Sequence, residues 1–340
     1  MKAKISPKIM DRPRVELQEV IPLPYPFSIQ LDISDACNLK CNFCFHSDVE
    51  SICRNHVKFG IMDYSLYCNI IDGIKESWGD NHEIKKLRLF ANGEPLLNPR
   101  VIDMIEYADR MKIAEVIEIT TNGTLIDDYF VENVAKSGLG IINISVNGLN
   151  ASQYKEFCGV SIEWDAFVEN IAKLFDKRGD CRIFIKLSNI GYSQEEIDLF
   201  YQTFGDICDN IFVEGLSADI WKDTDVHNKI NVKDMGLYGD RYTSKKVCTS
   251  VFTTLFINSF GIAKLCCLDW KSQYVIGDLN RQRIDEIWTG EKLSEIQKKF
   301  LQDGRCIPLC EGCDWPEMST PDNIDLYTDI LLERIEQRKK

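Results

Sequence analysis

Three cysteines gather near the start of the chain, in the stretch "DACNLKCNFCF". Cys37, Cys41 and Cys44 follow one another at intervals of four and three residues. Three thiolates at this spacing can bind three irons of a cubane [4Fe–4S] cluster and leave the fourth iron without a protein ligand. A small molecule can bind such an open iron, as it binds the open position of a catalytic zinc. A structural zinc with a distant fourth ligand, such as His46 or His56, is the alternative interpretation.

A second cysteine group lies in the last third of the chain. Cys248 and Cys266 flank Gly261, a residue that can turn a hairpin, and Cys310 and Cys313 follow as a CxxC pair. Four thiolates would complete the ligand set of a closed [4Fe–4S] cluster. A zinc-ribbon-like site is the alternative, because paired cysteines suit Zn²⁺ equally well.

Two neighbouring cysteines leave the ligand set of the second group open. Cys267 is adjacent to Cys266, and Cys306 lies four residues before Cys310, so either could replace an assigned ligand. The spacing from Gly261 to Cys266 and the CxxC pair favour the assignment given above. We do not expect the fourteen cysteines to form a disulfide framework, since the chain lacks an export signal and the cytosol keeps thiols reduced.

The composition is that of a soluble globular chain. Its 340 residues are 44% apolar and 27% charged, and they suffice for one large domain or two ordinary ones. No apolar run approaches the roughly 18 residues of a membrane-spanning helix, and the first residues lack the apolar core of a signal peptide. We therefore expect a cytoplasmic protein that does not engage membranes. A formal net charge of −13 argues against nucleic-acid binding, which rests on clustered Lys and Arg.

Short β-rich runs alternate with longer amphipathic stretches from Ser28 to about Glu214. Strands are predicted at residues 28–33, 85–91, 115–120, 141–146, 182–187 and 210–215. Helices are predicted between them at residues 63–78, 99–111, 126–137, up to about 177, and 194–204. About six strand–helix repeats favour a parallel sheet in a partial (β/α)6 barrel, whose chemistry gathers at the carboxyl ends of the strands.

The pattern changes after the sixth strand. A polar stretch precedes an expected hairpin of residues 250–257 and 261–266, a helix at 283–300 and a terminal amphipathic helix. The sequence thus predicts an α/β barrel followed by a small α+β domain. The expected boundaries are 1–27 (N-terminal extension), 28–216 (barrel), 217–244 (linker), 245–318 (cysteine-rich domain) and 319–340 (C-terminal helix).

The first cysteine group resembles a known family signature. Cys37-x3-Cys41-x2-Cys44, with the aromatic Phe43 immediately before the last cysteine, is similar to the motif of the radical S-adenosylmethionine (SAM) enzymes. The resemblance implies a barrel core in which the methionine amine and carboxylate of SAM chelate the iron that the three cysteines leave open.

Three further stretches resemble the family in the expected order. "ANGEPLLNP" is similar to its GGEP segment, although Asn92 replaces the first glycine, and "TTNGTLI" and "ISVNG" match common versions of its later motifs. Lys155 falls where relatives often carry an arginine for the SAM carboxylate, and a lysine supplies charge without the planar fork. The SAM contacts implied by the resemblance are Phe43, Gly93, Glu94, Pro95, Asn122, Ser145 and Lys155.

The second cysteine group resembles the twitch form of the SPASM domain, a shortened module with one auxiliary [4Fe–4S] cluster. Full SPASM domains continue with further cysteines, whereas this sequence has none after Cys313. The resemblance therefore implies two [4Fe–4S] clusters, one held by Cys37, Cys41 and Cys44 and the other by Cys248, Cys266, Cys310 and Cys313.

The resemblance also implies a reaction. A flavodoxin- or ferredoxin-type donor reduces the cluster, the cluster passes the electron to SAM, and the 5′-deoxyadenosyl radical takes a hydrogen atom from an unactivated C–H bond. The stretches "CTSVFTTLFINSFGIAKLCC" and "IGDLNRQRIDEIWTGEKL" are especially similar to the aminocyclitol dehydrogenase of the butirosin pathway. We therefore expect two-electron oxidation of an alcohol in a small carbohydrate-like or aminocyclitol-like substrate, with the auxiliary cluster as electron acceptor.

Three other functions stay open. A peptide maturase would share the SPASM domain, although such relatives often carry a leader-recognition domain of about eighty residues and only 27 residues precede the first predicted strand. An electron-transfer protein with two clusters is less expected, because it would need no SAM site. A radical epimerase would need a thiol that returns a hydrogen atom, and the candidate donors are Cys53, Cys158, Cys181 and Cys208.

The two-cluster hypothesis predicts an iron content. After anaerobic reconstitution we expect about eight irons per chain, and about four when Cys37, Cys41 and Cys44 are all replaced by alanine, because one cluster loses its ligands. Iron and acid-labile sulfide analysis measures both values. About four irons in the unchanged protein would rule out the auxiliary cluster.

Overall fold

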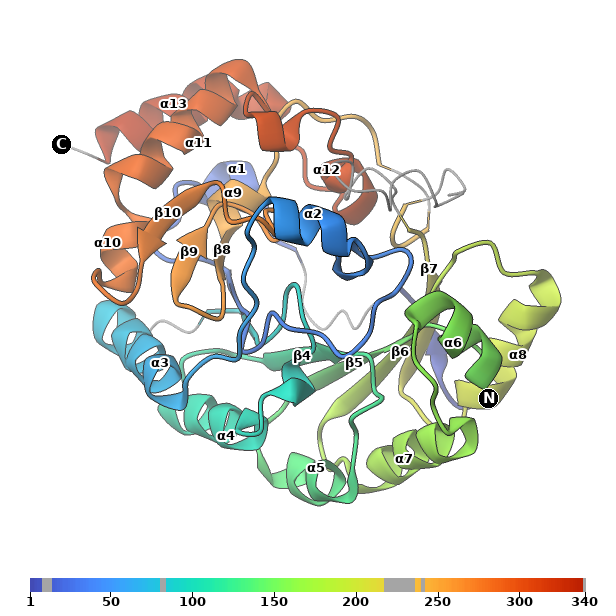
Figure 1. Cartoon of the computed structure of the whole chain (residues 1–340). Coiled ribbons are helices and arrows are strands. Elements are labelled where there is room, and N and C mark those ends of the chain that lie inside the picture. The colour runs from blue at the N-terminus through green and yellow to red at the C-terminus, as the bar shows by residue number, and fades with distance from the viewer. Residues whose placement is uncertain (8–13, 80–83, 217–235, 240–241, 339–340) are drawn as a thin grey trace.

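The computed structural model describes residues 1–7, 14–79, 84–216, 236–239 and 242–338. Figure 1 shows strands that curve around the middle of the molecule and helices that lie outside them. Most of the expected linker 217–244 lies outside the described residues.

Six parallel strands form the barrel part of the structure and confirm the predicted fold class. Each strand pairs with its neighbour in chain order, so the carboxyl ends of all six lie at the same edge of the sheet. They are β2 (Ser28–Leu31), β3 (Lys86–Arg88), β4 (Ile117–Thr121), β5 (Ile141–Val146), β6 (Arg182–Ser188) and β7 (Asn210–Glu214).

The two faces of these strands differ in chemistry, as β5 illustrates. Ile142, Ile144 and Val146 are fully buried in the main apolar core. Asn143 and Ser145 alternate with them and therefore face the inside of the barrel. The strands thus present an apolar face to the helices and a polar face to the barrel interior.

The predicted barrel helices are present, and local capping explains where two of them begin. The Asp63 carboxylate accepts hydrogen bonds from the first backbone N–H groups of α3, and Ser193 and Glu196 form a capping box at the start of α8. No helix among the described residues is both long and apolar enough to cross a membrane. The helices are α3 (Tyr64–Trp78), α4 (Val101–Met111), α5 (Asp128–Asn133), α6 (Ala151–Cys158), α7 (Trp164–Lys177) and α8 (Gln194–Phe204).

The second part of the chain continues the barrel sheet. Strand β8 (Thr254–Ile257) pairs in parallel with β2, and β9 (Ile262–Lys264) and β10 (Val275–Asp278) follow in antiparallel order. With β1 (Lys4–Ile5) beside β7, the sheet order is β1-β7-β6-β5-β4-β3-β2-β8-β9-β10. The expected hairpin therefore forms, but its first strand is shorter than predicted, because Ser250–Thr253 is the helix α9.

A glycine divides the helix that was expected at residues 283–300. The structure has α10 (Ile284–Trp288) and α11 (Glu291–Asp303), with extended backbone at Gly290 between them. A Cβ at Gly290 would lie 2.4 Å from the Glu286 carbonyl oxygen, so the break requires glycine. Helix α13 (Thr328–Gln337) lies beside α11 (Figure 1).

Several short elements complete the described structure. The remaining α-helices are α1 (Leu17–Val20), α2 (Val49–Arg54) and α12 (Trp315–Ser319). The short 3₁₀ helices are Phe45–Ser47, Pro95–Leu97, Val134–Lys136, Pro308–Cys310 and Asp325–Tyr327.

The shared sheet predicts that the hairpin contributes to the stability of the whole core. Leu255 on β8 is fully buried beside Ile29 of β2, and Leu255→Ala should lower the free energy of unfolding by about 2–5 kcal/mol through the lost contacts and the cavity. Thermal unfolding followed by circular dichroism measures the change. The control Leu199→Ala removes a half-exposed side chain from α8 and should cost about 0.5 kcal/mol or less. An equal loss for the two variants would contradict a shared core.

Candidate active site

The first cysteine group lies in the loop that follows β2. The backbone N–H of Cys44 donates to the Cys41 carbonyl at 2.9 Å, and the N–H of Leu39 points at the Cys37 sulfur at 3.5 Å. Burial raises the pKa of the Cys37 thiol to about 11 and that of Cys44 to about 12. Three thiolates can persist in this buried loop only beside positive charge, which bound irons would supply.

The end of helix α6 supports this cluster loop. The N–H groups of Lys40 and Asn42 donate to the carbonyl oxygens of Cys158 and Phe157, at 3.0 Å and 2.7 Å. The Cys158 thiol also approaches Cys41, and the hydrogen bond between these thiols raises the pKa of Cys41 well above its usual value. Cys158 is therefore a neighbour of a cluster ligand.

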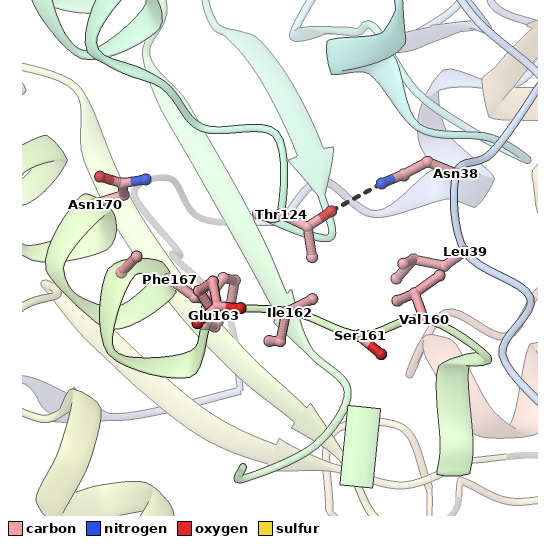
Figure 2. Close-up of a pocket in the computed structure, with 11 residues that line it drawn as sticks. Asn38, Leu39, Thr124, Val160, Ser161, Ile162, Glu163, Phe167 and Asn170 are labelled. Carbon is pink, nitrogen blue, oxygen red and sulfur yellow. Dashed lines mark hydrogen bonds between the residues drawn. The ribbon is translucent and has the colours of Figure 1, made fainter. Parts of the chain in front are cut away.

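Asn38 fixes the other side of the cluster loop. Its amide donates to the Thr124 hydroxyl at 2.9 Å, and its side-chain oxygen accepts from the Asn122 amide at 2.8 Å. Figure 2 shows Asn38 pointing toward Thr124 at the rim of a pocket of about 290 Å³ that also touches the start of α7. None of the thiols lines this pocket.

Glu94 links the loops that follow β3 and β4. Its buried carboxylate accepts hydrogen bonds from the Leu96 N–H, the Thr121 hydroxyl and the Asn122 N–H, at 2.9, 2.7 and 2.7 Å. Burial raises the pKa of Glu94 to about 7, although each of these donors lowers it. The structure thus brings Glu94 and Asn122 together, and their contacts with SAM stay a prediction.

Asn92 connects the same loop to the loop after β2. Its N–H donates to the buried Asp32 carboxylate at 2.8 Å, and its carbonyl oxygen lies 2.7 Å from Nε2 of His46. Burial raises the pKa of Asp32 to about 6, and the charge of Lys264 opposes this shift. Sequence reasoning assigned no role to Asp32 and considered His46 only as the fourth ligand of the alternative zinc site. The position of Asp32 near the end of the first predicted strand, 28–33, was the one available signal for this carboxylate.

The second cysteine group converges from three segments of the chain. Burial and the neighbouring thiols of Cys248, Cys266 and Cys313 raise the pKa of Cys310 far above its usual value. Burial also raises the pKa of Cys248 to about 11 and that of Cys313 to about 12. The N–H of Leu268 points at the Cys266 sulfur at 3.4 Å. No group of three or more His, Cys, Asp or Glu side chains in the described part of the chain is arranged to hold a single metal ion. The residue types of this all-thiol set suit an iron–sulfur cluster.

The two alternative ligands of this group behave differently. Cys267 lies among the four thiols, and a hydrogen bond with Cys266, followed by the charge of Lys264, lowers the pKa of Cys267. The Cys306 thiol instead lies 3.9 Å from the Lys299 carbonyl oxygen. The structure therefore leaves the choice between Cys266 and Cys267 open.

Comparisons with known proteins identify two domains in the chain. The model of the Radical SAM superfamily matches residues 31–197, and that of the SPASM iron–sulfur cluster-binding domain matches residues 248–314. The chain therefore carries a radical SAM domain followed by a SPASM domain. The radical SAM domain implies a [4Fe–4S] cluster and SAM, and the SPASM domain implies a further iron–sulfur cluster, in place of the zinc alternatives.

Several known proteins and solved structures are similar to this chain. The GTP 3′,8-cyclase of Clostridium perfringens is 27% identical over 186 residues, which are 55% of this chain and 54% of that protein. BtrN in complex with AdoMet and 2-DOIA has a TM-score of 0.54 at 13% identity, with 88% of this chain and 98% of that chain covered. Streptococcus suis SuiB bound to the precursor peptide SuiA has a TM-score of 0.62 at 17% identity, with 90% and 76% covered. The chain spans about half the length of the curated relative, and the solved structures share its fold.

The other predicted SAM contacts of this radical SAM protein are more dispersed. Pro95 is buried beside Glu94, and Phe43 is half-buried in the cluster loop. Ser145 lies on the inner face of β5, and Lys155 is exposed on α6. Among the described residues no contact joins Lys155 to the loops that hold Glu94, so its role in SAM binding stays a prediction.

The structure does not bring the candidate hydrogen-atom donors to the barrel interior. Cys158 is fully buried against Cys41, and Cys53 is exposed on α2. Cys181 and Cys208 are buried just before β6 and β7, at the amino edge of the sheet. The first cysteine group lies at the opposite, carboxyl edge, in the loop that follows β2.

Charged and amide side chains line the inside of the barrel. Glu118 accepts hydrogen bonds from the Lys86 ammonium at 2.8 Å and from the Asn143 amide at 2.9 Å. The Arg88 guanidinium lies 3.8 Å from Glu118, and its buried Nε has no hydrogen-bond partner among the described residues. Arg88 can therefore still donate to a bound molecule.

A second ion pair completes this lining, with Lys186 and Glu214 2.8 Å apart. We call the set the polar belt: Lys86, Arg88, Glu118, Asn143, Lys186 and Glu214. Toward the amino ends of the strands an apolar cluster, the apolar floor, fills the barrel: Val116, Ile141, Phe184 and Phe212.

The packing of Gly93 generates a prediction for SAM. A Cβ on Gly93 would lie 2.4–2.6 Å from backbone atoms of Ser34, Asp35 and Ala36, so Gly93→Ala must push the two loops apart. We expect SAM cleavage to fall by about 100-fold, the usual cost of a displacement of roughly 1 Å in an active site. Anaerobic 5′-deoxyadenosine formation at constant iron content measures this.

The matched control is Gly73→Ala in α3, where no atom lies within 4 Å of the added Cβ. This change should stabilise the helix by about 0.5–1 kcal/mol and leave SAM cleavage unchanged. Equal cleavage by the Gly93 and Gly73 variants would contradict a SAM site at this loop.

Proposed function

We propose that this protein is a radical SAM dehydrogenase that oxidises an alcohol group of a small carbohydrate-like or aminocyclitol-like molecule. The polar belt is the observation that carries the proposal. Carboxylates accept hydrogen bonds from hydroxyl groups, while the Arg88 guanidinium donates them, so the belt suits a polyhydroxylated molecule. An apolar substrate would bury these polar groups without offering them hydrogen bonds, which is energetically unfavourable.

The proposed reaction balances as a two-electron oxidation. When bound, SAM and its reduced cluster supply a radical that removes a hydrogen atom from carbon, and the auxiliary cluster supplies an acceptor for one electron. The carbinol carbon loses the hydrogen atom, its hydroxyl loses a proton, and one electron leaves, so a ketone forms. The belt carboxylates Glu118 and Glu214 would orient the hydroxyl and receive its proton.

The positions of the thiols favour dehydrogenation over epimerisation. An epimerase of the expected kind needs a cysteine that returns a hydrogen atom to the face opposite the radical source. All fourteen cysteines lie within the described residues, and none occupies an inner-face position of β2 to β7. Solved structures similar in fold include BtrN with AdoMet and 2-DOIA, which is compatible with a small substrate.

The proposal includes an electron donor and a compartment. SAM cleavage needs a strong one-electron reductant, and a flavodoxin- or ferredoxin-type protein is the donor that we propose. Thiols that must stay reduced to bind clusters suit the cytosol, where we place the enzyme.

Turnover by the reconstituted enzyme tests the proposal. With SAM and dithionite under anaerobic conditions, a panel of inositols, aminocyclitols and hexosamines should include compounds that raise 5′-deoxyadenosine formation above the substrate-free level. Mass spectrometry in D₂O should then find a product two mass units lighter than its substrate, without carbon-bound deuterium. A product of unchanged composition that gains deuterium at carbon would instead indicate epimerisation.

A ligand variant tests the role of the auxiliary cluster in this reaction. Cys310→Ala/Cys313→Ala should retain SAM cleavage but form less ketone per 5′-deoxyadenosine, because the electron acceptor is lost. An unchanged ratio would remove the auxiliary cluster from the proposed reaction.

A further inference from the structure

The two cluster loops touch through a pair of aromatic rings. Phe45 directly follows the ligand Cys44, and Trp270 lies four residues after the ligand Cys266. The rings stack with their centroids 4.9 Å apart and their planes inclined by 21°, and both side chains are buried. One ring from each cluster loop therefore belongs to the same buried contact.

Trp270 is held in a turn that also carries the auxiliary ligand. The N–H of Asp269 donates to the Cys266 carbonyl at 3.2 Å, and the Asp269 carboxylate accepts from the Tyr274 N–H at 2.7 Å. The buried Lys264 ammonium donates to the Asp269 carbonyl at 3.2 Å. These bonds fix the turn, so the position of the Trp270 ring depends on that of Cys266.

On the other side, Phe45 leads to the loop that follows β3. It stacks on His46 with centroids 4.3 Å apart, and Nε2 of His46 lies 2.7 Å from the Asn92 carbonyl oxygen. Asn92 is followed directly by Gly93 and Glu94. A displacement of the Phe45 ring would therefore shift both Cys44 and the loop that contains Gly93.

A second contact between the same regions avoids Trp270. The N–H of Ser259 in the hairpin turn lies 3.4 Å from the Asp35 carboxylate, which also accepts from the Gly60 N–H at 2.5 Å. This contact and the β2–β8 pairing should hold the hairpin in place when the Trp270 ring is removed. The aromatic stack can therefore be tested without detaching the second part of the chain.

We propose that Trp270 is a positioning residue for SAM. Its ring, stacked on Phe45, holds the SAM-cluster loop and the Asn92–Glu94 loop in the arrangement that binds SAM. SAM affinity thereby depends on the turn that carries the auxiliary ligand Cys266. The inference rests on the two cluster sites and is independent of the identity of the substrate.

Three variants test the stack in the full chain after anaerobic reconstitution. Trp270→Leu keeps an apolar side chain but removes the ring, Trp270→Phe keeps a ring, and Phe45→Leu removes the other partner. Electron paramagnetic resonance of the reduced protein, titrated with SAM, gives the SAM dissociation constant from the change in the cluster signal. We expect Trp270→Leu to weaken SAM binding about three- to tenfold, the range for loss of an aromatic pair, and Trp270→Phe to stay within about twofold.

Non-additivity distinguishes a shared contact from two separate effects. Trp270→Leu should weaken SAM binding much less in the Phe45→Leu background than in the unchanged protein, because the stack is already absent. Trp288→Leu is the matched control, since this equally buried indole on α10 bonds to the Leu23 carbonyl at 3.1 Å. It should lower the melting temperature without changing the SAM dissociation constant.

Loss of the auxiliary cluster must not be mistaken for loss of the stack. Trp270→Leu is therefore also introduced into the Cys310→Ala/Cys313→Ala protein, where the auxiliary site is already disabled, and should still weaken SAM binding there. Unchanged SAM affinity at full iron content, additive effects of the Phe45 and Trp270 changes, or no effect in the disabled background would each overturn the proposal. No substrate is present in these titrations, so failure of the dehydrogenase proposal would not alter their outcome.

Discussion

The main physical constraint on this structure is the burial of the seven thiols assigned to the two clusters. A buried thiolate persists only beside compensating positive charge. Burial raises the pKa of Cys37, Cys44 and Cys248, so without bound metal these groups stay protonated at neutral pH. The loops around them are nevertheless held by backbone hydrogen bonds, for example from Lys40 and Asn42 to the end of α6. Clusters would thus enter loops that are already ordered, which lowers the entropic cost of binding them.

The sheet explains how two cluster sites far apart in sequence come to lie close together. Strand β8 pairs with β2, and β2 is the strand from which the first cysteine loop emerges. The second part of the chain is therefore a lateral extension of the barrel sheet. Its position is fixed by backbone hydrogen bonds, to which the contacts of Asp35 and Phe45 with the hairpin region are added. The predicted boundary near residue 245 therefore falls within one continuous sheet, in which β8 still runs parallel to the barrel strands and β9 is the first antiparallel strand.

Local patterns in the sequence were sufficient for the barrel elements. The prediction at 141–146 coincides with β5, because apolar residues alternate there with Asn143 and Ser145, and the one at 194–204 coincides with α8, whose capping box is visible in the sequence. The short strands β1 and β10 were missed. Strand β1 forms through pairing with β7, which is distant in sequence, and β10 forms through pairing with β9. The break at Gly290 was also missed, because a helical pattern continues across it.

Contacts between loops were beyond the reach of sequence patterns. The family resemblance pointed to Glu94 and Asn122, which the structure joins by a hydrogen bond. It could not reveal that Asp32 and His46 hold Asn92, or that Cys158 lies against Cys41, because those contacts depend on how separate loops meet in space. Sequence patterns also could not decide whether Cys266 or Cys267 is the cluster ligand, since both thiols lie at the same site.

The apolar floor limits the routes by which polar molecules can enter and leave the barrel. Ile141 and Phe184 are buried, with Val116 and Phe212 packed against them, so a polar molecule that moved past this cluster would have to cross an apolar surface. A molecule resting on the polar belt must arrive and depart past the carboxyl edge or through the open side of the sheet. A large substrate and SAM that both enter at the carboxyl edge cannot bind and leave independently of each other. This arrangement favours an ordered sequence of entry and release.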